Sequence, residues 1–170
     1  SHDKGIHIIN GYFREIFGRR HPLSFSANIV FEQGYGMIDG DSASAAEICA
    51  LISCMSDIPI KQSIAITGSV NQKGDIQPIG GINEKIEGFF EICNSRGLTG
   101  TQGVIMPRLN VKDLMLNDDV INAVSEKKFH IYPVSSITDA VEIITGVKAC
   151  EMKHDGLFLS GTVYGRVEKR

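Results

Sequence analysis

A helix begins within residues 80–86, which read Gly-Gly-Ile-Asn-Glu-Lys-Ile. From there to about residue 95, apolar side chains recur with the period of an α-helix and gather on one arc, opposite an arc of Asn and Glu. The apolar arc consists of Ile82, Ile86, Phe89, Phe90, Ile92 and Cys93. Lys85 falls inside this arc, so the pattern predicts an amphipathic helix that carries one amine on its buried face.

Similar patterns on both sides of this helix predict a mixed fold. Helical periodicity indicates further helices over residues 5–17, 42–56, 111–126 and 137–145. Alternation or short apolar runs indicate strands over residues 23–31, 62–67, 103–107 and 129–134. A turn at Asn71-Gln72-Lys73-Gly74 is expected to fold strand 62–67 back onto a partner that stops at Pro78. The sequence therefore predicts an α/β or α+β domain.

Length and composition indicate one globular domain. The chain has 170 residues, of which 42% are apolar and 22% charged, typical of a soluble globular protein with one core. We expect a single domain over residues 1–170, with a core over residues 3–146 and residues 1–2 left from an expression tag. The sequence leaves residues 147–170 unassigned, as either a docked arm or a contact with a partner.

Several function classes are disfavoured. A net charge of −3 argues against a nucleic-acid partner, and the local basic spot around Arg14 reads as ordinary surface. No apolar run approaches about 18 residues and the chain has no signal peptide, so we expect no membrane partner. The five histidines lack the spacing of metal ligands, so we expect no metal. No phosphate-binding loop motif occurs, which excludes ATP hydrolysis by that route.

Four cysteines bear on the compartment of the protein. They form no C-x-x-C pair, and three fall at apolar positions of predicted helices. We interpret Cys49, Cys54, Cys93 and Cys150 as buried thiols in a reducing cytosol, and we expect a cytoplasmic protein.

Ser42 is a candidate nucleophile. It lies in Gly40-Asp41-Ser42-Ala43-Ser44, a turn that opens a helix rich in small residues. Backbone N–H groups at a helix start lack intrahelical partners, so those near Asp41 and Ser42 are suited to stabilise a developing oxyanion. The alternative is that Ser42 or Asp41 only caps the helix.

Lys85 is the candidate base. An amine held on an apolar face loses hydration, which disfavours its charged form. A neutral amine can accept the proton of a serine hydroxyl. The alternative is a lysine whose stem packs on the core while its ammonium group reaches water.

Two more residues are candidates for supporting roles. Thr67 ends the predicted strand 62–67, and its hydroxyl is placed to orient the Lys85 amine; the alternative is an ordinary strand threonine. Asp39 and Asp41 flank the nucleophile turn, and Asp39 is a possible ionic partner of Lys85. This pairing is a hypothesis based only on the proximity of Asp39 to Ser42 in the sequence. It would be discarded if Asp39→Asn left the titration of the lysine unchanged.

These residues resemble a known family. The chain is similar to the proteolytic domain of Lon proteases in Asp39-Gly40-Asp41-Ser42-Ala43-Ser44, in Thr67-Gly68, and in Pro78-Ile79-Gly80-Gly81 followed by Glu84-Lys85. The threonine and the lysine follow the serine by 25 and 43 residues, which is the spacing of that family. The resemblance covers about residues 5–146. One departure is Ser69, which stands where many bacterial members have Glu.

Two branches of the family contribute to the likeness. The form Gly-Asp-Ser-Ala-Ser resembles the archaeal-type branch. Other stretches resemble a bacterial branch of Lon-like ATP-dependent proteases, namely residues 84–90, 96–100, 129–133 and 161–163.

The resemblance implies a fold, an activity and partners. The fold would be α+β (α/β two-layer), of the Lon proteolytic type, ribosomal-protein-S5-domain-2-like. The activity would be that of a serine endopeptidase acting on polypeptides, with Ser42 as nucleophile, Lys85 as base and Thr67 in support. Family members usually form hexameric rings and carry a fused ATPase module, absent here, that holds ATP and Mg; this chain itself would need no cofactor. The alternatives are a non-catalytic scaffold or oligomerisation module, and a dyad that is inactive until its neighbours arrange the loop 33–41.

Overall fold

The computed structural model describes residues 2–17 and 42–169, with side chains from residue 7 onward. The strand predicted over residues 23–31 and the loop 33–41 lie outside the described residues. Helices and a parallel sheet combine as the sequence predicts, so the α+β class is confirmed.

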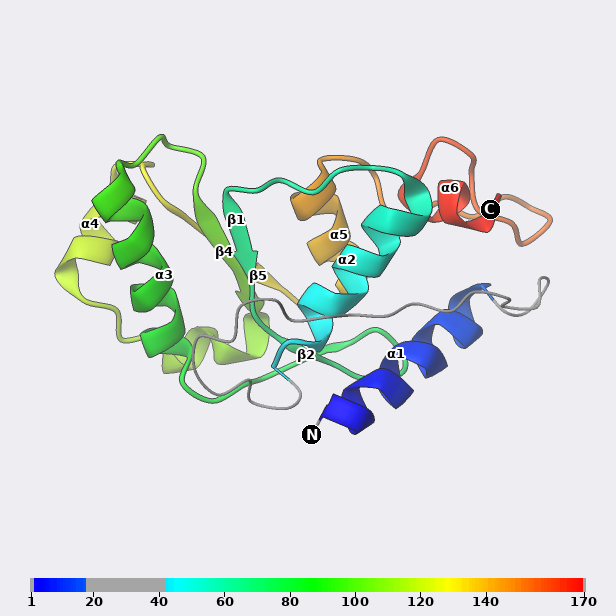
Figure 1. Ribbon diagram of the computed structural model, residues 1–170, viewed down its shortest axis with the longest axis horizontal. Coiled ribbons are helices and arrows are strands. Elements are labelled where there is room, and N and C mark those ends of the chain that lie inside the picture. The colour runs from blue at the N-terminus through cyan, green and yellow to red at the C-terminus, as the bar shows by residue number, and fades with distance from the viewer. Residues whose placement is uncertain (1, 18–41, 170) are drawn as a thin grey trace.

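A parallel sheet of three strands lies at the centre of the fold (Figure 1). Its strands are β1 (Ile64–Ile66), β4 (Gly103–Pro107) and β5 (His130–Val134), in the order β1-β4-β5. Every residue of β4 is buried, as expected of a central parallel strand with both faces covered.

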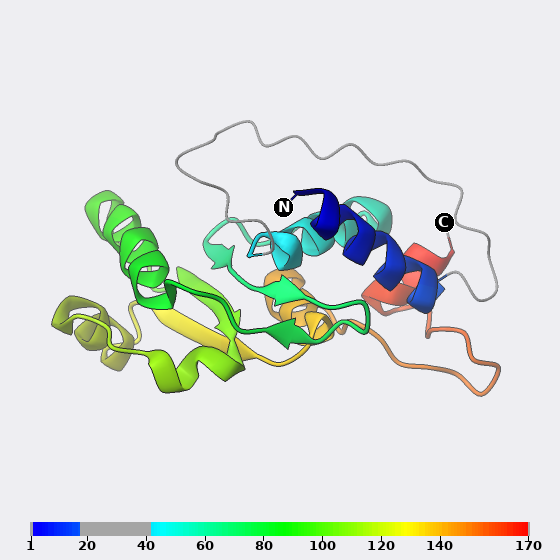
Figure 2. The same cartoon turned by 90° about the horizontal axis from the view of Figure 1, so that it is seen from below.

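Helices cover both faces of this sheet (Figures 1 and 2). On one face, Ile105 of β4 joins a core cluster that includes Ile48 of α2 (Ser44–Ser56) and Ile144 of α5 (Ile137–Thr145). On the other face, Met106 joins a cluster with Ile86 of α3 (Ile82–Arg96) and with side chains of α4 (Asp118–Ser125). Successive side chains of a strand point to opposite faces, which is why neighbouring residues of β4 belong to different clusters.

The predicted pairing of strand 62–67 is wrong, although its turn is confirmed. β1 pairs with β4 in parallel, while the hairpin consists of β2 (Ser69–Val70) and β3 (Ile76–Gln77). The Asn71 side chain accepts hydrogen bonds from the N–H groups of Lys73 and Asp75, each at 3.0 Å, which closes the hairpin turn. The chain leaves the sheet at Thr67 and Gly68, so the hairpin forms a separate small sheet.

The helix predicted over residues 111–126 is also wrong, because it is interrupted. A 3₁₀ helix, η1 (Arg108–Asp113), precedes a linker, and α4 begins after Asn117, whose side chain accepts from the Val120 N–H. In the linker, the N–H of Met115 donates to Asn83 and that of Asn117 donates to Glu87, both on α3. These N–H groups serve another element, so the helix cannot run through them.

The C-terminal segment, which the sequence left unassigned, docks onto the core. It ends in α6 (Val163–Glu168), which packs against α2 and α1 (His2–Phe17). The buried hydroxyls of Tyr12 and Tyr164 share a short hydrogen bond, and the ring of Phe17 lies 5.3 Å from that of Tyr164. The two ends of the described chain therefore complete the same side of the core.

The thiols differ more in exposure than the sequence predicts. Cys49 and Cys93 are buried and Cys150 is half-buried, but Cys54 is exposed. The expectation that Cys54 is buried is wrong because it lies on the solvent side of α2. Burial raises the pKa of Cys49 to about 12.

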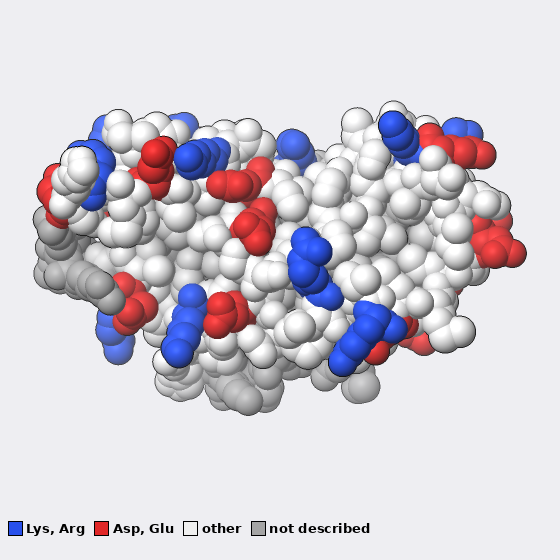
Figure 3. All heavy atoms as spheres, turned by 180° about the vertical axis from the view of Figure 1, so that it is seen from behind, with Lys and Arg blue, Asp and Glu red and all other residues white. Residues whose placement is uncertain are grey.

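The described surface gives two further observations. Among residues 2–17 and 42–169, no helix has the length and apolar character needed to cross a membrane. On the face shown in Figure 3, Lys and Arg side chains alternate with Asp and Glu.

Substitution of Gly165 tests whether α6 docks against the segment that contains Leu159. A Cβ atom at Gly165 would overlap the backbone carbonyl oxygen of Leu159, which cannot move aside easily. We expect Gly165→Ala to lower the free energy of unfolding by about 1–3 kcal/mol, as overpacking does. Gly161→Ala is the matched control, because nothing lies within 4 Å of a Cβ atom there. Equal stability of both variants in denaturant titrations would contradict the docking.

Cysteine alkylation tests the packing of α2. With its pKa raised to about 12, the Cys49 thiol stays protonated near neutral pH and is also shielded from reagent. We expect iodoacetamide at pH 8 to modify Cys54 in the folded protein and to modify Cys49 only after denaturation. Peptide mass spectrometry gives both rates, and similar rates in the folded state would rule out this packing.

Candidate active site

Ser42 lies in a turn that the end of β1 holds by its backbone. The Gly68 N–H donates to the Ser42 carbonyl at 3.0 Å, and the Gly68 carbonyl accepts from the Ala45 N–H at 3.1 Å. The buried hydroxyl of Ser44, which the sequence reasoning did not single out, accepts from the Val70 N–H at 2.9 Å. These bonds bring Ser42 next to the segment that contains Thr67.

The helix after Ser42 starts later than predicted. α2 begins at Ser44, and Ala43 occupies the cap position without a side-chain cap bond. The Ala45 N–H is already used by Gly68, so it is not available to an oxyanion. Asp41, whose N–H was predicted to help stabilise the oxyanion, lies outside the described residues, as does Asp39.

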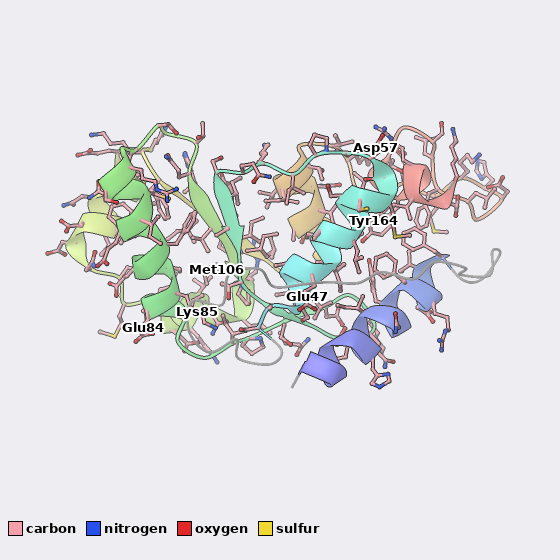
Figure 4. All side chains as sticks on the ribbon, in the orientation of Figure 1. Glu47, Asp57, Glu84, Lys85, Met106 and Tyr164 are labelled. Carbon is pink, nitrogen blue, oxygen red and sulfur yellow. The ribbon has the colours of Figure 1, made fainter. Side chains whose placement is uncertain are left out.

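Lys85 lies in the first turn of α3, and its amine is buried. Figure 4 shows Lys85 on the side of α3 that faces the sheet, and Glu84 on the outer side. The Nζ atom has almost no contact with solvent and makes no hydrogen bond within the described residues. The arc predicted for this helix is mostly confirmed, since Ile82, Ile86, Phe90 and Cys93 are buried. Ile92 is the exception, with 53% of its surface exposed.

The central strand connects the two candidate residues. The Thr67 N–H donates to the Ile105 carbonyl of β4 at 3.0 Å. The next residue, Met106, packs in the same cluster as Ile82 and Ile86, which flank Lys85 in α3. The starts of α2 and α3 therefore both lie at the end of the sheet where β1 and β4 terminate (Figure 1).

The first turn of α3 has supports that the sequence reasoning missed. Asn110 of η1 bonds the backbone of Ile79, and Asn83 bonds the backbone of Asp113 and Met115. No periodicity could identify these two amides, because their partners lie about 30 residues away in the sequence.

The described candidates are one amine, that of Lys85, and two hydroxyls, those of Ser42 and Thr67. Lys85 Nζ, buried and without a hydrogen bond to any described residue, is a candidate general base. Among the described residues, no three His, Cys, Asp or Glu side chains form a group able to hold a metal ion.

Comparison with known proteins identifies the family. The family model for the Lon protease (S16) C-terminal proteolytic domain matches residues 25–146. This chain belongs to that family.

Individual relatives agree with this assignment. The chain is 52% identical over 143 residues to a putative Lon protease homolog of Escherichia coli, which covers 84% of this chain and 24% of the relative. It is 51% identical over 145 residues to a putative Lon protease homolog of Haemophilus influenzae, covering 85% and 24%. An archaeal Lon protease of Thermococcus kodakarensis is 38% identical over 119 residues, covering 70% and 17%. The chain thus spans about a quarter or less of the length of these relatives.

Replacement of Lys85 tests whether the amine has a structural partner. A buried polar group without a hydrogen bond costs about 1–3 kcal/mol, and methionine fills a similar volume without that cost. We expect Lys85→Met to keep or raise the free energy of unfolding, measured by thermal and urea denaturation. The exposed Lys153, changed to Met, is the control, with no effect expected. A large loss of stability in Lys85→Met alone would point to a structural ion pair.

Proposed function

We propose that this chain is the proteolytic domain of a Lon-like ATP-dependent protease and hydrolyses peptide bonds with a Ser42–Lys85 dyad. The observation that carries the proposal is the buried Lys85 amine, which lies without a hydrogen-bond partner among the described residues. Such an amine costs stability and makes no structural hydrogen bond in return, which supports a chemical role. Membership in a family of proteolytic domains supports the same conclusion.

The reaction takes two steps. Ser42 Oγ attacks the carbonyl carbon of the substrate while Lys85 Nζ accepts the hydroxyl proton. Collapse of the intermediate breaks the C–N bond, and the lysine returns that proton to the leaving amine, which leaves an ester on Ser42. Water, deprotonated by the same amine, then hydrolyses the ester and restores Ser42. Backbone N–H groups near Asp41 and Ser42 stabilise the oxyanion in both steps.

Thr67 supports the dyad in this proposal. Its backbone is bonded to Ile105, and Gly68 beside it is bonded to Ser42. In this structure its hydroxyl makes no hydrogen bond to the Lys85 amine, and we propose that it does so only when substrate is bound, which would fix the direction of the amine. Asp39 as a partner of Lys85 in the resting state stays a prediction.

The wider setting is proposed on the same basis. The relatives are much longer than this chain and are named as Lon protease homologs or archaeal Lon proteases. We propose that the domain works beside an ATPase module that uses ATP and Mg, in a hexameric ring in the cytoplasm, on polypeptide substrates.

A second candidate is a domain whose dyad is inactive in isolation. The turn with Ser42 directly follows residues 33–41, which contain three glycines. Glycine permits many backbone conformations, so contacts with a ring neighbour or an ATPase module can select the conformation of the Ser42 turn. Peptide cleavage by the isolated chain, compared with the same domain joined to the ATPase module, separates the two candidates.

Ser42→Ala tests the nucleophile. We expect peptide cleavage to fall by at least about 10³-fold, because no other residue takes over the covalent step. Binding of a peptide boronate should be lost in parallel, while the melting temperature stays within a few degrees. Ser95→Ala is the control, since Ser95 lies in the last turn of α3 and its exposed hydroxyl bonds the Ile92 carbonyl. Undiminished turnover in Ser42→Ala would reject the mechanism.

A further inference from the structure

The first turn of α3 is not held by a cap of its own. Its cap residue, Gly81, has left-handed backbone angles (φ 69°, ψ 30°) and makes no side-chain cap bond. The first bond along the helix runs from the Lys85 N–H to the Gly81 carbonyl at 3.1 Å. Gly81 has no side chain to accept from the first N–H groups of the helix, so contacts from other elements can fix the entry to α3.

Asn110 supplies that hold from η1. Its Oδ1 accepts from the Ile79 N–H at 2.9 Å, and its Nδ2 donates to the Ile79 carbonyl at 2.9 Å. The same Nδ2 donates to Asp113 Oδ2 at 3.0 Å. The amide thus uses both of its N–H donors and its oxygen, and only 2% of the residue is exposed.

The Lys85 amine makes no hydrogen bond within the described residues, so its position follows from its backbone and from the packing of its stem. The chain enters α3 through the turn from Ile79 to Gly81. Asn110 holds this turn, because it bonds both the N–H and the carbonyl of Ile79. We propose that Asn110 is a positioning residue for Lys85 and keeps its amine within reach of the Ser42 hydroxyl. The inference rests on the proposed function, since it concerns the same dyad.

Burial makes Asn110 the more important of the two supporting amides. Asn83 also links α3 to the linker after η1, by bonds of 2.9 Å to the Asp113 carbonyl and 2.7 Å to the Met115 N–H. Those bonds are exposed, so water can replace them at little cost. Asn110 is almost fully buried although Ile79 is only half-buried, so water replaces the Asn110 amide less easily than the Asn83 amide. A shift of about 1 Å in a catalytic group can reduce turnover by about 10²-fold.

The test uses Asn110→Asp, which keeps the shape but removes both donors. Its carboxylate would face the Ile79 carbonyl and the Asp113 carboxylate, and repulsion should displace the turn. We expect kcat for a peptide to fall about 10- to 100-fold with KM changed less than about twofold. Labelling of Ser42 by a fluorophosphonate should slow in parallel. Asn83→Ala, a milder variant, should lower kcat only a few-fold.

Thr162→Val is the matched control. Thr162 is also 2% exposed, and its hydroxyl makes two hydrogen bonds, to Leu159 and Gly165 at the opposite end of the molecule. We expect a similar loss of stability in this variant but labelling and kcat close to wild type. Hydrogen exchange at the Lys85 amide should accelerate in Asn110→Asp and remain unchanged in Thr162→Val.

The outcomes separate this inference from the proposed function. If wild type is labelled at Ser42 and Asn110→Asp is labelled as fast as Thr162→Val, the positioning role is wrong and the dyad stands. If wild type joined to its ATPase module is labelled no faster than Ser42→Ala, the dyad fails and the positioning role fails with it. Slow labelling confined to the Asn110 and Asn83 variants supports the inference.

Discussion

The site depends on Gly68, whose N–H bonds Ser42 in the turn before α2 and whose carbonyl bonds Ala45 in the first turn of α2. These two bonds, to Ser42 and Ala45, join the end of β1 to the start of α2, which comes earlier in the chain. β1 is itself fixed by its parallel pairing with β4, and β4 is buried along its whole length. The buried central sheet thus sets the position of the Ser42 backbone.

Lys85 is positioned from the opposite face of β4. Met106 packs with the two isoleucines that flank Lys85, while Ile105 packs with α2. A central strand whose side chains alternate between two cores is able to bring two helix starts to one end of the sheet. Burial at the start of α3 removes the Lys85 amine from water.

Local patterns predict the elements well and their partners poorly. Helix α5 matches its predicted range because Ser136 caps its start and Gly146 ends it in a left-handed conformation. The pairing of β1 could not be predicted, since its partner lies about 40 residues away and short apolar strands carry no register signal. The break at residues 114–117 depends on side chains of α3, which no window around those residues contains. Periodicity placed Lys85 on the buried face, but it could not identify Asn110, whose role is tertiary.

The central claim is that a buried lysine amine and a serine hydroxyl meet at the end of the parallel sheet. An experimental structure at high resolution measures this directly, as the distance between Ser42 Oγ and Lys85 Nζ. The account predicts a hydrogen-bonding separation of about 2.6–3.2 Å, or a somewhat longer one without substrate. An Nζ atom in bulk solvent, or one bonded to a carboxylate on the side of α3 away from Ser42, would contradict it.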